Sequence, residues 1–227
     1  MPFQDLPARL AEVRAKIEEA RQRGGRGQGV TIVAVTKTYG ADAATAAWNA
    51  GVEDVGENRV QEAGVKMTEV SVPLRWHLIG HLQRNKVKQL DGFHLVHSMD
   101  SGRLADALDE HGRNRNRPVD VLLQVNVSGE GTKGGYGPAD VDAESERLAG
   151  MTGLLVRGVM TMAPFDADEA TLRRVFGGAR DAAATLRAAG LPATELSMGM
   201  SGDYEVAVEE GATLVRLGTV LFGARSA

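Results

Sequence analysis

The sequence contains no cysteine, which excludes disulfide bonds, a thiolate nucleophile and cysteine-ligated zinc. It has no basic excess either: the formal net charge is −4 at pH 7, which offers little attraction to a nucleic-acid backbone. No apolar run approaches the length of a membrane span, and residues 1–22 lack the apolar segment of a signal peptide. We therefore expect a cytoplasmic protein that binds neither membranes nor nucleic acid.

What the sequence does contain is a regular alternation of short apolar strands and helices over its 227 residues. No change in composition marks a linker, so we expect one domain spanning residues 1–227. Eight strand-helix units predict a TIM (β/α)8 barrel; an open, doubly wound sheet is the alternative, because strand order cannot be read from sequence. The predicted strands cover residues 30–35, 52–55, 74–79, 93–98, 119–127, 155–162, 195–198 and 214–217.

The two ends of the chain refine this prediction. Leu6, Leu10, Val13 and Ile17 recur at helical spacing, which predicts an extra helix before the first strand. Only residues 219–227 follow the eighth strand, which is too few for a full closing helix. We expect the N-terminal helix to cover the gap beside this truncated final helix.

Lys37 stands where the first predicted strand ends. That strand is a β-branched run typical of a strand buried on both faces, so a lysine at its carboxyl end would be partly desolvated. Desolvation favours the free amine over the ammonium, and the free amine is the form that attacks an aldehyde. Lys37 is therefore a candidate for Schiff-base chemistry. A strand-end lysine that only extends its head into solvent would show the same pattern.

Small and polar residues follow the last two predicted strands. Ser201 and Asp203 precede a short helix predicted over 204–210, and Gly218 and Thr219 follow strand eight. Loops at these two places commonly bind phosphate in barrels, and the N–H groups at the start of a helix favour an anion. A phosphate site is one interpretation. The other is that Ser201 and Asp203 only cap the helix.

Arg216 interrupts the apolar eighth strand. A buried guanidinium is costly unless a partner compensates it, so the sequence implies a partner at this point. A guanidinium has no lone pair with which to accept a proton. If Arg216 faced the ring nitrogen of a pyridine cofactor, that nitrogen would stay unprotonated and the ring would be a weaker electron sink.

Seven short segments carry a family resemblance. They are AVTKT at 34–38, GENRVQE at 56–62, WHLIGHLQRNK at 76–86, QVN at 124–126 with Lys133-Gly134, MTMAP at 160–164, LSMGMS at 196–201 and VRLGT at 215–219. Any one of them is weak, but seven in order, from about Ile32 to Arg225, are specific. Together they closely resemble the pyridoxal phosphate (PLP) homeostasis proteins, a family similar to the N-terminal barrel of alanine racemases.

This resemblance implies a function and a set of ligands. Lys37 would hold PLP as a Schiff base, the phosphate would lie against Ser201, Gly218 and Thr219, and Arg216 would face the pyridine nitrogen. Asn58 and the backbone of Met200 would make secondary contacts. The cofactor-binding residues are then Lys37, Asn58, Met200, Ser201, Arg216, Gly218 and Thr219. The protein would be a monomeric PLP carrier, without catalytic residues, that buffers PLP or delivers it to apo PLP-dependent enzymes.

The alternative is a PLP-dependent enzyme of the amino-acid racemase type. Racemisation removes a proton on one face and returns it on the other, so it needs a second acid-base group besides Lys37. Racemases take that group from a second domain, for which this sequence shows no counterpart. Tyr39, His81 and Lys133 are the local candidates. Tyr39 and Gly40 also depart from the family, in which many members have a second basic residue or a proline here.

Two further patterns bear on function. His77 with His81, and His94 with His97, suggest a metal-dependent hydrolase, but His77 lies within a predicted strand, where a spacing of four does not bring two side chains together. We therefore expect no metal. The Gly-rich segment 128–138, which contains Glu130 and Lys133, is expected to move over the site.

Overall fold

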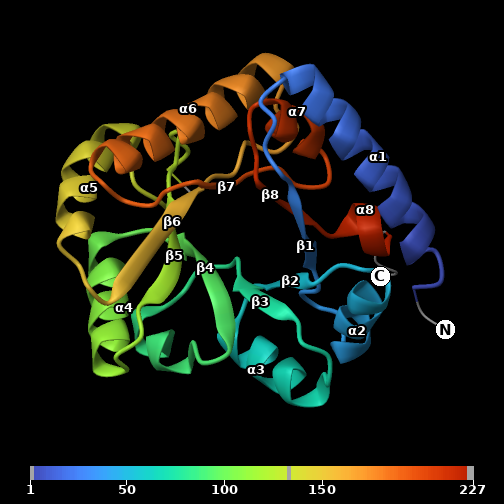
Figure 1. Ribbon diagram of the computed structural model, residues 1–227, viewed down its shortest axis with the longest axis horizontal. Helices are drawn as coiled ribbons and strands as arrows, with labels where there is room; N and C mark the ends of the chain where they lie inside the picture. Colours follow the sequence, from blue (N-terminus) through green and yellow to red (C-terminus); the bar gives the residue numbers. More distant parts are fainter. Residues whose placement is uncertain (1–2, 132–133, 224–227) are drawn as a thin grey trace.

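The computed structural model describes residues 3–131 and 134–223. Within them, eight parallel strands form a closed barrel in chain order, surrounded by helices (Figure 1). The predicted TIM barrel is confirmed, and the open doubly wound sheet is excluded. The strands are β1 (Thr31–Val35), β2 (Asp54–Glu57), β3 (Arg75–Leu78), β4 (Phe93–Met99), β5 (Val119–Gln124), β6 (Leu154–Met160), β7 (Glu195–Ser197) and β8 (Leu214–Leu217).

Helices follow the strands as the alternation predicts, and one of them is a 3₁₀-helix rather than an α-helix. It covers Arg84–Gln89, where the N–H groups of Lys86 and Leu90 are donated three residues back. None of the helices in the described residues is long and apolar enough to cross a membrane. The helices are α1 (Leu6–Gly24), α2 (Ala41–Asn49), α3 (Val60–Glu69), η1 (Arg84–Gln89), α4 (Gly102–Asn114), η2 (Pro138–Asp140), α5 (Val141–Ala149), α6 (Glu169–Ala188), α7 (Tyr204–Glu209) and α8 (Thr219–Phe222).

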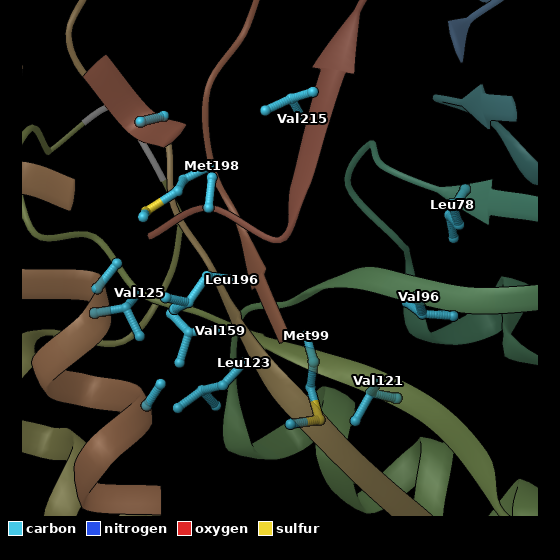
Figure 2. Packing of buried hydrophobic residues seen from close by; sticks show 14 of the residues in the cluster. Leu78, Val96, Met99, Val121, Leu123, Val125, Val159, Leu196, Met198 and Val215 are labelled. Atoms are coloured by element: carbon cyan, nitrogen blue, oxygen red, sulfur yellow. The ribbon is translucent and has the colours of Figure 1, made fainter. Parts of the chain in front are cut away.

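Two hydrophobic clusters hold the barrel together. The larger lies between the strands and the helices, and Figure 2 shows part of it. The smaller fills the barrel interior, where alternate residues of each strand point inward. Its buried members are Val33, Leu95, Leu122, Met160 and Leu214. Polar side chains at the inward positions therefore stand out against an apolar background.

The N-terminal helix covers the gap in the helical layer. α1 packs along α7 and α8, and Figure 1 shows it beside both at the same side of the barrel. Leu10 and Val13 bury its inner face. On its outer side, Arg23 donates to Glu209 of α7 at 2.6 Å. Since α8 contains only four residues, α1 does the covering that a full eighth helix would do, as predicted.

Candidate functional site

The carboxyl ends of β7, β8 and β1 lie side by side. β8 pairs with both neighbours, and Leu217 of β8 lies opposite Ala34 of β1. Lys37, three residues beyond Ala34, and Gly218, one residue beyond Leu217, therefore leave the barrel on adjacent strands. This end of an α/β barrel is where active sites are built.

Lys37 is half-buried in the turn that follows β1. Thr36 before it is fully buried, and Thr38 after it has φ 69°, a left-handed backbone that β-branched residues rarely adopt. Tyr39 donates its backbone N–H to the Thr36 carbonyl at 3.1 Å and closes the turn. Strand alternation places Lys37 on the same side as Val33, which faces the barrel interior.

A buried ion pair lies behind this turn, between the barrel and α3. Lys66 Nζ donates to Glu57 Oε1 at 2.6 Å and to the Thr36 carbonyl at 2.9 Å. The Thr36 hydroxyl donates to the same Glu57 oxygen at 2.5 Å. The sequence interpretation missed this pair. The available signal was that Lys66 follows Val60 and Ala63 at a spacing of three, on the buried face of α3.

The loop after β7 turns back onto the start of α8. Gly199 has φ 92°, and a Cβ added there would lie 2.7 Å from the Cβ of Ala207, so the turn requires glycine. Within the described residues, Ser201 Oγ accepts the backbone N–H of Val220 in α8, at 3.3 Å, rather than capping α7. This contact brings Ser201 beside Gly218 and Thr219, the two residues expected to share a phosphate with it.

Asn58 and Met200 are placed differently from each other. Asn58 follows β2, the other neighbour of β1, and a Cβ at Gly80 would lie 2.4 Å from the Asn58 carbonyl oxygen. Asn58 therefore lies at the same end of the barrel as Lys37. Met200 donates its backbone N–H to Asp203 Oδ1 at 2.6 Å, so this donor is already used within its own loop. A phosphate contact from Met200 stays a prediction.

Arg216 is 5% exposed, inside the barrel, and its protein partners are uncharged. Nη1 donates to the carbonyl and hydroxyl oxygens of Ser197 at 2.8 and 2.6 Å, and Nη2 donates to the Thr161 carbonyl at 3.0 Å. Burial lowers the pKa of Arg216 to about 10, although Asp203 opposes this. No carboxylate of the described residues forms an ion pair with it. A desolvated cation of this kind fits an anionic ligand.

The partners of Arg216 continue into a row of buried polar side chains. Ser197 Oγ lies 2.8 Å from His97 Nδ1, His97 Nε2 lies 2.8 Å from His77 Nδ1, and His77 Nε2 lies 2.9 Å from Asp54 Oδ1. We call Arg216, Ser197, His97, His77 and Asp54 the polar row. Sequence reasoning missed it, although His77 and His97 fall in adjacent predicted strands.

The contacts of the histidines therefore differ from the two pairs, His77 with His81 and His94 with His97, that the sequence spacing suggested. His77 meets His97 and also the ring of His94, at a centroid distance of 5.5 Å. His81 instead lies 2.9 Å from Asp100 Oδ2, with 68% of its side chain exposed. No group of three or more metal-binding side chains occurs in the part of the chain that the structure describes.

Tyr39 belongs to an aromatic cluster rather than to the barrel interior. Its ring lies 5.7 Å from that of Phe3 and 5.2 Å from that of Phe222, between centroids. The cluster joins the β1 turn to α8 and to the segment before α1. The departure from the family at Tyr39 thus has a packing role here.

The segment expected to move over the site is described in part. Lys133 lies outside the described residues. Asn126 Nδ2 donates to the Glu130 carbonyl at 2.9 Å, and Asn126 Oδ1 accepts the N–H of Gly129 at 3.1 Å. These contacts tie the start of the segment to the end of β5; movement over the site stays a prediction.

Two hollows lie at the amino-terminal end of the barrel, opposite the mouth that holds Lys37. One, of about 220 Å³, is lined in part by Arg75, His94 and Asp120. The other, of about 330 Å³, is lined in part by Arg14 and Arg75. That end of an α/β barrel contributes to stability rather than chemistry, so we place the candidate site at the opposite mouth.

Replacing Asp54 with asparagine should remove an acid-dependent part of the stability. Burial raises the pKa of Asp54, but hydrogen bonds from His77 and Arg75 outweigh it and hold that pKa at about 2. Because the folded pKa lies below the unfolded one, the stabilisation is complete above about pH 4 and is lost as the pH falls towards 2. Urea unfolding should show Asp54→Asn about 2 kcal/mol less stable at pH 7, and less dependent on pH below 4. An unchanged acid slope would contradict this.

Comparison with known proteins places the chain in a family. Residues 8–226 match the family described as alanine racemase, N-terminal domain. The pyridoxal phosphate homeostasis proteins of Pseudomonas aeruginosa and Deinococcus radiodurans are 42% and 44% identical to the chain; the matches cover 95% and 96% of this chain and 94% and 99% of theirs. The chain belongs to the alanine racemase N-terminal domain family and, within it, to the pyridoxal phosphate homeostasis proteins, as the seven segments indicated.

Solved structures agree with this assignment. PipY of Synechococcus elongatus PCC7942, in the form without PLP, is 40% identical and has a TM-score of 0.87, covering 96% of this chain and 100% of PipY. The PLP-bound form of PipY is 39% identical and has a TM-score of 0.84 over the same shares. Alanine racemase from Corynebacterium glutamicum, 17% identical with a TM-score of 0.73, covers 94% of this chain but only 61% of the racemase; it shows a common fold alone.

Proposed function

We propose that this protein binds PLP at the carboxyl end of its barrel and buffers or delivers it, without strong catalytic turnover. The observation that carries the proposal is that Arg216, a buried cation without a carboxylate partner in the described structure, lies at the same barrel mouth as Lys37. The PLP-bound structure of PipY supports the same ligand.

Each residue has a definite task in this proposal. The Lys37 amine would bind the aldehyde of PLP, which supplies reversible imine chemistry with amines. Ser201 and Thr219 would donate hydroxyl hydrogens, and Gly218 its backbone N–H, to the phosphate. Asn58, at the neighbouring strand end, would make a secondary contact.

Arg216 would limit catalysis. Its guanidinium donates hydrogen bonds and cannot accept a proton, so it disfavours protonation of a ring nitrogen that it faces. An unprotonated ring withdraws fewer electrons from a substrate. The same residue that binds the cofactor would therefore weaken carbanion chemistry.

The racemase alternative needs a second acid-base group, and the described candidates are engaged elsewhere. Tyr39 packs between Phe3 and Phe222, and His81 is exposed and paired with Asp100. The curated relatives are named for homeostasis rather than for a reaction. These observations favour a carrier. Delivery to apo PLP-dependent enzymes, a monomeric state and a cytoplasmic location stay predictions.

Transfer and turnover should separate the two functions in one experiment. The protein is loaded with PLP, freed of excess ligand, and mixed either with an apo PLP-dependent enzyme or with L-alanine. We expect the apo-enzyme to be reactivated and alanine to remain essentially unracemised, with free PLP at the same concentration as the control. Racemisation at roughly one turnover per second or more would overturn the carrier function in favour of the enzyme.

A further inference from the structure

The polar row crosses the barrel interior beside the apolar cluster of Val33, Leu95, Leu122, Met160 and Leu214. Its five members are at most 5% exposed, and they come from β2, β3, β4, β7 and β8. Burying so many polar groups is costly unless all are satisfied. The row therefore costs folding free energy that an apolar barrel interior would not.

The positions of the protons in the row follow from its two charged ends. Asp54 is ionised at neutral pH, so it accepts from His77 Nε2. At the other end, Ser197 Oγ accepts from Arg216, so the Ser197 hydroxyl donates to His97 Nδ1. Buried, neutral His97 then carries its proton on Nε2 and donates it to His77 Nδ1.

Every hydrogen bond in the row therefore points the same way, from the cation Arg216 to the carboxylate of Asp54. Such aligned bonds polarise one another. The negative end lies near the amino-terminal end of the barrel, where Arg75 also donates to both Asp54 oxygens at 2.8 and 2.7 Å. Arg216 thus has a distant counter-charge, although no carboxylate touches it within the described residues.

The surroundings keep His97 from gaining a second proton. Burial lowers the pKa of His97 well below its usual value, and the nearby Arg216 cation lowers it further. A proton added to His77 would also reverse the His97 tautomer and leave the Ser197 hydroxyl without its acceptor. The titratable or charged groups that face the row from its neighbours are Arg75, His94, Asp120 and Asp203.

We propose that Ser197, His97, His77 and Asp54 are positioning residues that hold the guanidinium of Arg216 in one orientation towards the cofactor ring. The proposal rests on the proposed function for its ligand. It adds that the fit of the ring depends on a carboxylate at the other end of the barrel, which does not touch the cofactor.

The first test needs no cofactor. In ¹⁵N-labelled protein free of PLP, long-range ¹H–¹⁵N spectra at neutral pH should show the proton of both His77 and His97 on Nε2, with Nδ1 unprotonated. In Ser197→Ala the Nδ1 resonance of His97 should move downfield, because it loses its donor. The Nδ1–H tautomer at either histidine in the wild-type protein would overturn the proposed direction of the row.

The second test measures the fit of the cofactor. Ser197→Ala should release PLP about tenfold faster than the wild-type protein, since a hydrogen bond to a charged group is lost, and its visible absorbance should change with pH at a different midpoint. Ser145→Ala is the matched control: that hydroxyl is also buried, but it donates to the Asp142 carbonyl within α5 and not to a member of the row. We expect it to behave as wild type.

These measurements distinguish failure of the proposed PLP-binding function from failure of the positioning role. If wild-type protein gave no PLP absorbance band, the proposed function itself would be overturned. If wild type bound PLP and Ser197→Ala released it at the wild-type rate with the same pH midpoint, only the positioning role would be wrong. If Ser197→Ala does not fold, Ser197→Thr replaces it in the test, because threonine keeps the hydroxyl. Ser197→Thr should retain the wild-type rate of PLP release and the wild-type His97 tautomer. A change in both would overturn the proposal.

Discussion

A Lys37→Ala protein is expected to lose the yellow PLP adduct that borohydride fixes onto the wild-type chain. Among the described residues, Lys37 supplies an amine at the barrel mouth that can bond covalently to an aldehyde, and without it phosphate and ring contacts remain. PLP affinity should fall roughly hundredfold or more. Absorbance titration gives the affinity, and peptide mapping after borohydride reduction locates the adduct.

The control for this prediction is another lysine. Lys88→Ala changes an exposed residue of η1 and should leave the spectrum and the adduct as in wild type. Lys66 is no competitor, since its amine is buried and already donates to Glu57 and Thr36. A Lys37→Ala protein that still carried the reduced adduct at full occupancy would show that another residue binds the aldehyde.

Most of the fold could be predicted because each strand is a separate local signal. The β-branched run before Lys37 and the helical spacing of Leu6 to Ile17 both gave elements close to those observed. The residues at which strands end were less predictable. β5 was expected to reach residue 127 but stops at Gln124, because the next residues bond to the returning loop, with Asn126 donating to the Tyr136 carbonyl at 2.9 Å. Sequence pattern alone does not reveal such a contact.

The residues of the site likewise differ in how far the sequence could predict them. Lys37, Ser201, Gly218 and Thr219 could be assembled in advance because parallel strands bring their carboxyl ends together whatever the details of pairing. The polar row could not, since its contacts depend on register. A shift in pairing between Trp76 and His77 sets His77 opposite Leu95, and a shift of one residue would turn a side chain to the other face.

Lys66→Met should be the most destabilising single change at the buried ion pair. Glu57 is fully buried and Lys66 is 7% exposed. Methionine matches the length of lysine but leaves the Glu57 carboxylate without its cation, a loss of about 3–5 kcal/mol. Within the described structure Glu57 Oε2 has no hydrogen-bond partner, so Oε1 carries the compensating contacts. Urea unfolding followed by fluorescence of the buried Trp76 measures the change.

A double-mutant cycle separates the pair from simple packing. If the cost of Lys66→Met comes from an uncompensated carboxylate, then Glu57→Gln in the same protein should restore most of the stability, because a neutral amide is far cheaper to bury. Lys88→Met, an exposed change of the same chemistry, should stay within about 0.5 kcal/mol of wild type. Additive losses from Glu57→Gln and Lys66→Met would mean that the two side chains do not stabilise each other. Because Lys66 also donates to the Thr36 carbonyl, next to Lys37, the double variant should regain stability while still binding PLP more weakly than wild type.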